Sequence, residues 1–405
     1  MGMGMGTALL TIAQARVAVM AAARPLEREC VAVTEALDRV LAEDLRAAGD
    51  VPGFASSAMD GYAVIAGGPD RTLRIIGESR AGAPSEDSVG EGEAMCVSTG
   101  AMVPAGATAV VRHEDVEERD GAVHLAAATR VGADIRSPGE DLRAGALVLS
   151  AGTRLGTAEL GAAVAAGAGE VIAARRPRVA VLCTGDELRA PGESLGPGQI
   201  HNSNAAMLVA FATRCGGDVR PAVRLRDERV GTEAALAEAL GRADVVVVSG
   251  GVSVGPHDHV KPALAALGVP EHFWGVNLQP GKPTWFGARD GRLVFGLPGN
   301  PVSAFVTFAL FARPAIAALQ GLAAEEQLDV AEAELGAPAR RNPHREQAIS
   351  VRVQRRGGRA IAWPNGPQGS HLVSSLLAAD ALAFIPPGEG DHPAGTIVPL
   401  EDLPR

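Results

Sequence analysis

Residues 245–261, which read VVVVSGGVSVGPHDHVK, decide the expected fold of the chain. Four consecutive valines run into SGG, and the stretch ends in the polar triplet HDH. A short apolar run without alternation predicts a strand that is buried on both faces, as in a parallel sheet covered by helices. The polar end of the stretch fits a zinc site, a phosphate cradle or a solvated loop, and the rest of the chain must discriminate among the three.

The composition excludes several classes of protein. A chain of 405 residues is too long for one core, so we expect about two to four domains. A net charge of -10 and a pI near 5.5 argue against binding of nucleic acid or anionic lipid. No uninterrupted apolar stretch approaches about 20 residues, and the start MGMGMGTALL lacks signal-peptide features. The four scattered cysteines form no C-x-x-C pair, so we expect a cytoplasmic protein without a membrane span.

Only two of the 37 basic residues are lysines, Lys261 and Lys282. A compact ammonium and a planar guanidinium are not interchangeable at a tight anion site. Lysines retained in such an arginine-rich chain are therefore candidate anion ligands, with chance as the competing explanation.

Residues 178–325 are expected to form a three-layer α/β domain with a mostly parallel sheet. The segments RVAVLCTGDEL, DVRPAVRLRD and DVVVVSGG have the apolar character of strands, and the segments NAAMLVAFATRCG and GTEAALAEALGRA between them have helical periodicity. A long helix from Pro301 to about Gln320 is expected to close this domain.

The flanking regions predict a multidomain α/β plus β protein. Residues 7–45 and 146–177 are expected to form a discontinuous helical domain, since TIAQARVAVMAAA, VTEALDRVLAEDL and TAELGAAVAAGAG show helical spacing. Residues 46–145 are expected to be an inserted β domain, with a hairpin that turns at Asp120-Gly121. Residues 326–405 are expected to be a small, barrel-like β domain.

Carboxylates follow the ends of the expected strands of the α/β domain. Ligands bind at the carboxyl ends of parallel strands, where this chain has Asp186 and Glu187, then Asp227, then Asp258. A single aspartate at such a position is often only a helix cap or turn former, but three strand ends around one crevice favour a site. Hard oxygen ligands of this kind suit Mg²⁺ bound together with a phosphate.

The loop 249–255 is the expected phosphate cradle, because its glycines let backbone amides approach an anion. It matches neither a Walker A loop nor a dinucleotide-binding fingerprint, and a plain turn remains the alternative. His257 and His259, with one aspartate and no thiolate, are a poor tetrahedral set for zinc, so we expect Asp258 to function and the histidines to be solvated.

Other motifs are ambiguous when taken alone. Asn300 and Pro301 are the usual start signal of a helix, although Ser303, in its first turn and expected near Lys282, can present a hydroxyl to an oxyanion. Asn202, Ser203 and Asn204 exceed what one helix cap requires. FASSAMDGYAV (54–64) and SPGEDLRAG (137–145) can be ordinary acidic turns.

Taken together, the motifs resemble the MoeA family of molybdopterin molybdenumtransferases, which is also similar to the gephyrin E domain. The resemblance runs from about residue 7 to the C-terminus. It rests on SAMDGYA (57–63), TGA (99–101), PGED (138–141), TGDEL (184–188), SGGVSVG (249–255) with Asp258, PGKP (280–283) and GLPGNPVS (296–303).

The resemblance implies an elongated homodimer in which the inserted β domain of one subunit faces the α/β domain of the other. It implies insertion of molybdate into adenylated molybdopterin, with Mg²⁺-dependent loss of AMP, to give molybdenum cofactor. It also implies transient contacts with the adenylyltransferase and with molybdoenzymes.

The resemblance assigns expected roles to residues of these motifs. The functional groups are Asp60, Asp141, Glu187, Asp227, Asp258 and Lys282, with Asp186, Glu187 and Asp258 as Mg²⁺ ligands. The candidate molybdate ligands are Lys282, Ser303, Arg345 and Ser370, and convergent cations and hydroxyls suit a tetrahedral dianion. The expected substrate-binding residues are Thr99, Thr184, Gly185, Asp186, Asn202, Ser203, Asn204, Ser249, Gly250, Gly251, Ser253, Gly255, Pro298 and Asn300.

One departure and two alternatives accompany this prediction. Gln279 stands where many relatives have a second lysine, which leaves the preference between molybdate and tungstate open. A molybdopterin adenylyltransferase would share the α/β domain but lack the flanking β domains and the Asp60 and Lys282 motifs. A non-catalytic scaffold like gephyrin would need additional interaction domains or a long linker.

Overall fold

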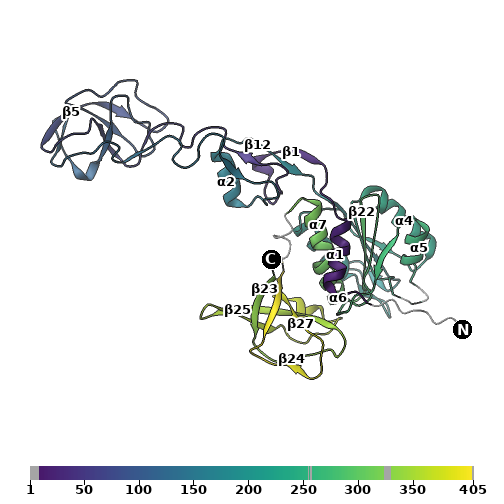
Figure 1. Ribbon diagram of the computed structural model, residues 1–405. Helices are drawn as coiled ribbons and strands as arrows, with labels where there is room; N and C mark the ends of the chain where they lie inside the picture. The colour runs from purple at the N-terminus through teal and green to yellow at the C-terminus, as the bar shows by residue number, and fades with distance from the viewer. Residues whose placement is uncertain (1–8, 254, 256–257, 323–329, 404–405) are drawn as a thin grey trace.

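The computed structural model describes residues 9–253, 255, 258–322 and 330–403. The described part of the chain is elongated, and Figure 1 shows its parts arranged along one direction. A β region that contains β5 (Arg71–Ser79) lies at one end, and the α/β domain with α4 (Arg229–Arg242) lies at the other. The C-terminal barrel lies beside the α/β domain.

The central sheet has the strand order β16-β13-β18-β22-β21-β19, with β17 also paired to β13. Pairing is parallel from β16 to β22 and antiparallel for β21 and β19. The strands are β13 (Arg178–Thr184), β16 (Asp218–Val219), β17 (Val223–Leu225), β18 (Val245–Ser249), β19 (Glu271–Trp274), β21 (Trp285–Arg289) and β22 (Arg292–Leu297). The sequence predicted β13, β17 and β18, whereas β19, β21 and β22 were not among the predicted strands.

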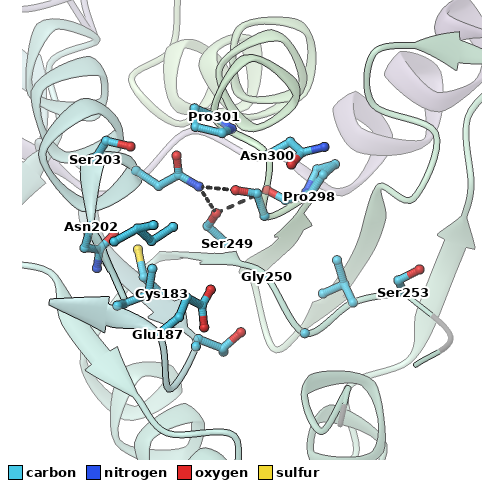
Figure 2. A pocket seen from close by; sticks show the side chains of 18 of the residues that line it. Cys183, Glu187, Asn202, Ser203, Ser249, Gly250, Ser253, Pro298, Asn300 and Pro301 are labelled. Carbon is cyan, nitrogen blue, oxygen red and sulfur yellow. Dashed lines mark hydrogen bonds between the residues drawn. The ribbon is translucent and has the colours of Figure 1, made fainter. Parts of the chain in front are cut away.

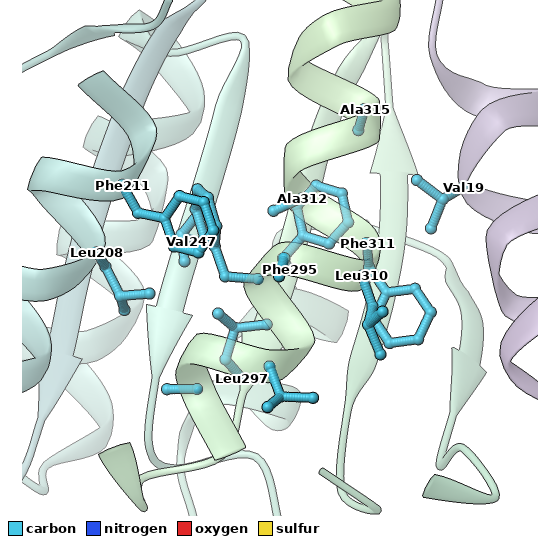
Figure 3. Packing of buried hydrophobic residues seen from close by; sticks show 14 of the residues in the cluster. Val19, Leu208, Phe211, Val247, Phe295, Leu297, Leu310, Phe311, Ala312 and Ala315 are labelled. Atoms are coloured by element: carbon cyan, nitrogen blue, oxygen red, sulfur yellow. The ribbon is translucent and has the colours of Figure 1, made fainter. Parts of the chain in front are cut away.

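Helices cover both faces of this sheet, and the alternation of β18 shows why. Val245 and Val247 pack into the core that faces α3 and the closing helix, while Val246 and Val248 pack into the core that faces α4 and α5. Each of the four valines is fully buried. Figure 3 shows the first core, in which Phe211 and Phe295 lie between the sheet and the closing helix. The helices are α1 (Ile12–Ala22), α3 (Ser203–Arg214), α4, α5 (Val260–Ala266), α6 (Pro301–Thr307) and α7 (Arg313–Leu319). Two short strands outside the central sheet, β14 (Leu188–Arg189) and β15 (Ile200–His201), pair in parallel with each other.

The closing helix Pro301–Leu319 is continuous, because the π-helical turn η3 (Phe308–Ala312) joins α6 to α7. It is long and apolar enough to span a membrane by length and composition alone, with a mean hydropathy of 1.8. However, 89% of that apolar stretch is buried inside the protein, so the apolar surface belongs to the core.

The N-terminal region differs from the expected helical domain. The segment 33–45 was predicted to be helical, but it contains only the 3₁₀ turn η1 (Val33–Glu35) before it reaches β2 (Leu45–Arg46). Asp38 has φ +61°, which interrupts a right-handed helix, and the apolar residues Val33, Ala36 and Leu41 pack instead on Leu155, Ala163 and Val171. The predicted helix α1 is present but packs into the core of the α/β domain.

The remaining N-terminal region consists of antiparallel pairs and one helix. The pair of β2 and β11 brings the two ends of the segment between them together, as expected for an insertion. The elements are β1 (Arg28–Ala32) paired with β12 (Glu170–Ala174), β2 paired with β11 (Leu147–Leu149), and α2 (Thr157–Ala165).

The inserted β region forms a sheet with the order β7-β4-β6-β5-β9-β8. The predicted hairpin is confirmed, since β8 and β9 pair around Asp120 and Gly121, both of which have positive φ. The strands are β3 (Ser56–Ser57), β4 (Gly61–Val64), β5, β6 (Glu93–Val97), β7 (Ala109–Arg112), β8 (Glu117–Arg119), β9 (Ala122–Leu125) and β10 (Ile135–Arg136), with the 3₁₀ turn η2 (His113–Asp115).

The C-terminal sheet closes on itself, as the barrel-like prediction required. β25 pairs with β26 and β27, and the order β26-β23-β29-β27 completes the ring. The elements are β20 (Leu278–Gln279), β23 (Val330–Leu335), β24 (Ala339–Arg340), β25 (Glu346–Arg356), β26 (Arg359–Pro364), the 3₁₀ turn η4 (Val373–Leu376), β27 (Ala381–Ile385), β28 (Asp391–His392) and β29 (Ile397–Asp402). The domain boundary expected at residue 326 lies outside the described residues, and the other boundaries stay predictions.

Two contacts attach the barrel to the α/β domain. β20 belongs to the loop before β21 of the central sheet, yet it pairs in parallel with β25 of the barrel. Glu401 of β29 is 2% exposed and forms ion pairs with Arg16 of α1 and Arg313 of α7. These contacts hold the barrel against the closing helix.

A buried carboxylate anchors the segment that enters the α/β domain from the N-terminal region. Asp244 lies just before β18 and accepts hydrogen bonds from the side chains of Arg175 and Arg178 and from the backbone N–H of Arg178. Burial by itself raises the pKa of Asp244, but the hydrogen bonds from the two arginines outweigh it and hold the pKa well below its usual range.

We predict that Asp244→Asn lowers the free energy of unfolding by about 3 kcal/mol, because it leaves guanidinium groups without their buried anion. The stabilisation by the carboxylate should be complete above the ordinary aspartate pKa of about 3.9 and should be lost as the pH falls through the lower folded-state value. Urea unfolding at pH 7, followed by tryptophan fluorescence, measures the destabilisation, and a series from pH 7 down to pH 2 measures how the difference from wild type shrinks on acidification.

The control is Asp290→Asn, which removes an exposed pair with Arg289 and should change stability by less than about 0.5 kcal/mol. Equal effects of the two substitutions would contradict the anchoring role of Asp244.

Candidate active site

A cavity of about 630 Å³ lies at the carboxyl ends of β13, β18 and β22. The structure brings together there most of the residues that the sequence singled out. Those that line it are Thr184, Gly185, Glu187, Asn202, Ser203, Asn204, Asp227, Ser249, Gly250, Gly251, Ser253, Asp258, Pro298 and Asn300. This placement follows from the parallel strands, whose ends meet at one edge of the sheet. The individual roles of these residues stay predictions.

A hydrogen-bonded network joins three of these segments. The Asn204 side-chain N–H₂ donates to Ser249 Oγ and to the carbonyl of Gly299, both at 2.8 Å, and Ser249 Oγ donates to the carbonyl of Pro298 at 3.2 Å. Figure 2 shows these bonds at the wall of the cavity. Because two backbone carbonyls can only accept, the network fixes the orientation of the amide. Asn204 Oδ1 is buried and has no partner among the described residues, so it is the one acceptor of the network left over.

Two glycines press the following loop against β13. Gly250 and Gly251 have φ values of +91° and +66°, which side chains rarely adopt. A Cβ atom on Gly250 would lie 2.7 Å from Thr184 Oγ1, and one on Gly251 would lie 2.8 Å from Val260. The loop therefore approaches Thr184 with bare backbone, which keeps the floor of the cavity open to a ligand.

The carboxylates are held by backbone groups around the cavity. Asp258 Oδ2 accepts from the N–H of Gly255 at 2.9 Å, and Asp227 Oδ2 accepts from the N–H of Asp186 at 3.4 Å. Asp186 and Glu187 are both exposed, but Glu187 lines the cavity, as Asp227 and Asp258 do, and Asp186 does not.

Of the two histidines that flank Asp258, only His259 belongs to the described residues. His257 lies outside the described residues, and His259 is half-buried at the start of α5. Among the described residues, no three or more His, Cys, Asp or Glu side chains are grouped to hold a metal ion. Cys183 lines the cavity, but burial raises the pKa of its thiol to about 11, so the group stays protonated.

None of the four candidate molybdate ligands lines the cavity itself. Lys282 is exposed, and the residue before it, Gly281, packs on Thr307 of α6. Ser303 is buried in the first turn of α6. Ser370 Oγ accepts a hydrogen bond from Asn300, and its carbonyl accepts from the N–H of Val302.

The fourth candidate molybdate ligand, Arg345, belongs to the barrel. Arg345 precedes β25, which pairs with β20 close to Lys282. Gln279 of β20 accepts a hydrogen bond from Asn342, so the residue at the position of the missing lysine has a structural contact between the two domains. Lys261, the other lysine, stacks on Trp274 with its Nζ 4.3 Å from the ring centroid.

The predicted residues of the inserted region form a separate group. Asp60 Oδ1 accepts from the backbone N–H of Thr99 at 2.6 Å and from its hydroxyl at 3.0 Å, and these bonds lower the pKa of Asp60. Asp141 lines a second cavity of about 570 Å³ in the same region. Figure 1 shows that this region and the α/β domain lie at opposite ends of the molecule, so one chain does not bring the two groups together.

Several residues at the sites escaped sequence reasoning. Pro283, His201 and His371 line the first cavity, and each lies directly beside a residue that was predicted. The unique Tyr62 is buried and donates to Glu118, and burial together with this bond raises its pKa, so its role is structural. No sequence pattern marked His371, because its position depends on the barrel.

These features define a class of protein built around an α/β domain of the molybdopterin-binding type. Residues 180–318 match the model described as a probable molybdopterin binding domain. Residues 10–167 match the MoeA N-terminal region (domain I and II), and residues 332–403 match the MoeA C-terminal region (domain IV). The chain belongs to the MoeA family.

Full-length relatives agree with this assignment. The chain is 34% identical to a molybdopterin molybdenumtransferase of Haemophilus influenzae, over 97% of this chain and 98% of the relative. It is 35% identical to molybdopterin molybdenumtransferase 2 of Mycobacterium tuberculosis, over 95% and 96%. The crystal structure of a molybdopterin biosynthesis MoeA protein from Pyrococcus horikoshii is similar, with a TM-score of 0.80 and 31% identity over 97% and 98% of the two chains.

We predict that Asn204→Asp destabilises the protein by about 2 kcal/mol, since the new oxygen would face the carbonyl of Gly299 without a proton to donate. The matched control is Asn202→Asp, because Asn202 caps α3 by accepting from the N–H of Ala205 and aspartate also accepts there. Thermal unfolding of both variants at pH 7 tests the network. Equal losses of stability in the two variants would show that the N–H groups donated by Asn204 do not contribute to the stability of the protein.

Proposed function

We propose that this protein is a molybdopterin molybdenumtransferase that inserts molybdate into adenylated molybdopterin and releases AMP to give molybdenum cofactor. The observation that carries the proposal is the cavity at the carboxyl ends of β13, β18 and β22, with its glycine loop and its ring of carboxylates and amides. Full-length similarity to proteins with this name supports it. A soluble, cytoplasmic location remains a prediction from the composition.

The amides and hydroxyls of the cavity suit the polar edge of a pterin. Asn204 lines the cavity, and its buried Oδ1 lacks a hydrogen-bond partner among the described residues. Thr184 and the amides of Gly250 and Gly251 suit a phosphate that approaches bare backbone. These groups would orient the substrate before reaction, and the walls of the cavity would limit access of water.

The donor set fits Mg²⁺. This ion takes one or two carboxylates and keeps waters and substrate phosphate as its other ligands, so it does not need a cage made by the protein alone. Glu187, Asp227 and Asp258 line the cavity and would hold the ion, with Asp227 in place of Asp186, which does not line the cavity. When bound, Mg²⁺ would neutralise charge on the phosphate of the adenylate group.

Molybdate would bind beside this cavity, with Lys282, Ser303, Arg345 and Ser370 as its ligands. Pro283 and His371, the neighbours of Lys282 and Ser370, line the cavity, which supports a connection between the two places. Two cations and two hydroxyls provide charge-assisted hydrogen bonds to a tetrahedral dianion. They would hold the oxyanion where the dithiolene of the pterin can reach it.

The defining experiment gives purified protein adenylated molybdopterin and Mg²⁺ and measures release of AMP with and without molybdate. We predict molybdate-dependent release, and we predict that Asp258→Ala reduces it by at least about 10²-fold, as for loss of one preorganised group. His259→Ala is the matched control and should retain most of the activity. Activity that survives in Asp258→Ala but is lost in His259→Ala, together with stoichiometric zinc in the protein, would overturn these assignments.

We also propose that the active unit is a homodimer in which Asp60 and Asp141 of one subunit complete the site of the other. The separation of the two groups in one chain supports this (Figure 1). We predict that Asp60→Ala and Lys282→Ala proteins are each inactive, and that mixing them restores roughly a quarter of wild-type activity through one intact site in each mixed dimer.

The mixing experiment needs proof of subunit exchange, for which two affinity tags on the two variants suffice. Mixed dimers that form but never recover activity would exclude a site shared in this way.

A further inference from the structure

The glycine loop that follows β18 (residues 250–253) carries a run of free backbone amides. Among the described residues, none accepts a hydrogen bond from the backbone N–H of Gly251, Val252 or Ser253. All three residues line the first cavity, and Figure 2 shows Gly250 and Ser253 along this loop. Successive N–H groups of this kind form a concave site for an anion. Such a site stabilises an anion best when the peptide units that carry the N–H groups are held in one orientation.

Trp274 fixes one of these peptide units. It is the last residue of β19, and its indole N–H donates to the carbonyl of Val252 at 2.9 Å. The carbonyl and the N–H of a planar trans peptide unit point in opposite directions. The bond to the Val252 carbonyl therefore turns the N–H of Ser253, which belongs to the same peptide unit, away from the indole.

The sheet explains why an indole from β19 reaches this loop. β22 is parallel to β18, and two antiparallel pairings return β19 to the same direction, so Trp274 lies at the edge of the sheet where the cavity lies. Pairing across these strands forms one row of residues, Val248, Gly296, Trp285 and Trp274. Gly296 leaves a notch in the row, since a Cβ atom there would lie 2.6 Å from the side chain of Val252. Val252 fills this notch and is only 2% exposed.

Lys261 in turn holds the indole. Its Nζ lies 4.3 Å from the centroid of the Trp274 ring, and the residue is half-buried in the first turn of α5. A cation in the first turn of a helix opposes the helix dipole, so this position is unfavourable for a lysine unless another contact stabilises it. The stack on Trp274 is such a contact. The same indole therefore connects the glycine loop to the helix that begins just after Asp258.

We propose that Trp274 positions the free amides of the glycine loop for the phosphate groups of the substrate, and that Lys261 keeps the indole in place. Trp274 is not among the described residues that line the cavity, so it acts through Val252 and is a positioning residue. The inference rests on the proposed function for the identity of the substrate. It also gives a role to the second lysine of the chain, which binds an aromatic ring instead of an anion.

The test measures equilibrium binding of inorganic pyrophosphate, with Mg²⁺, to the full-length protein. Trp274→Phe keeps an aromatic ring but loses the N–H, and it should weaken pyrophosphate binding about 10-fold, because the amide of Ser253 is no longer held. In turnover of adenylated molybdopterin, the same variant should raise KM about 10-fold and leave kcat within about threefold, as for a loss of uniform binding. A purely structural defect would lower kcat through the folded fraction and leave KM unchanged.

Trp285→Phe is the matched control. Trp285 pairs with Trp274 in the row, and its indole N–H donates to Glu271 at 2.6 Å, so the substitution removes the same kind of bond from a partner outside the glycine loop. Trp285 is 2% exposed, so this variant should lose at least as much thermal stability as Trp274→Phe and still keep its pyrophosphate affinity. Equal loss of affinity in the two variants would overturn the proposal, as would absent pyrophosphate binding by wild type.

Lys261 provides a second arm that leaves both indoles intact. Lys261→Met should weaken pyrophosphate binding about threefold, and Lys261→Arg should restore it, because a guanidinium also stacks on an indole. A loss in Lys261→Arg as large as in Lys261→Met would contradict the role of the stack and make Lys261 a direct anion ligand.

Failure of this inference can be distinguished from failure of the proposed function. If wild type releases AMP when molybdate is added and Trp274→Phe does so with unchanged KM, the function stands and the positioning role is wrong. If wild type shows no such turnover but the variants give the expected pattern of pyrophosphate binding, Trp274 positions an anion site and the proposed function fails.

Discussion

The burial of β18 on both faces is the constraint on which the α/β domain depends. Val245 and Val247 require a cover of helices on one side, and Val246 and Val248 require one on the other. The apolar run ends at Ser249, which is only 3% exposed, so its hydroxyl must find partners inside the protein. Asn204 and the carbonyl of Pro298 supply them, and the same bonds draw α3 and the start of α6 to the end of the sheet. The wall of the cavity is therefore a consequence of satisfying buried polar groups at the end of an apolar strand.

The barrel extends this arrangement by attachment to the closing helix. Glu401 is buried between Arg16 and Arg313, which come from different elements, and β20 pairs with β25. Separating a buried carboxylate from either of its two arginine partners costs free energy, so these ion pairs fix the barrel relative to α1 and the closing helix. In this arrangement Ser370 of the barrel accepts a hydrogen bond from Asn300 at the start of α6.

The inserted region lies at the other end of the molecule from the cavity of the α/β domain. Asp60 is ordered by Thr99, whereas Phe54 and Arg136 are exposed beside a cleft. The elongated shape of the molecule keeps these groups apart from the cavity of the α/β domain within one chain.

The sequence by itself determined the elements whose pattern is local. The continuous apolar runs of β13 and β18, the periodicity of α3 and α4, and the turn at Asp120-Gly121 each follow from the residues within them. The gathering of Glu187, Asp227 and Asp258 was also predictable, because parallel strands place their carboxyl ends at one edge. The family motifs added Lys282 and Asp60 to the residues predicted to function.

Only the tertiary structure decided the features that depend on distant partners. The segment 33–45 has a helical pattern but is not a helix, because its apolar residues pack on Leu155, Ala163 and Val171, which lie more than a hundred positions away. β22 had an apolar run of its own, yet its place beside β18 depends on pairing. The free Oδ1 of Asn204 and the exposed ring of Phe54 are likewise invisible in the sequence, because burial and unmet hydrogen bonds are properties of the surroundings and not of the residue.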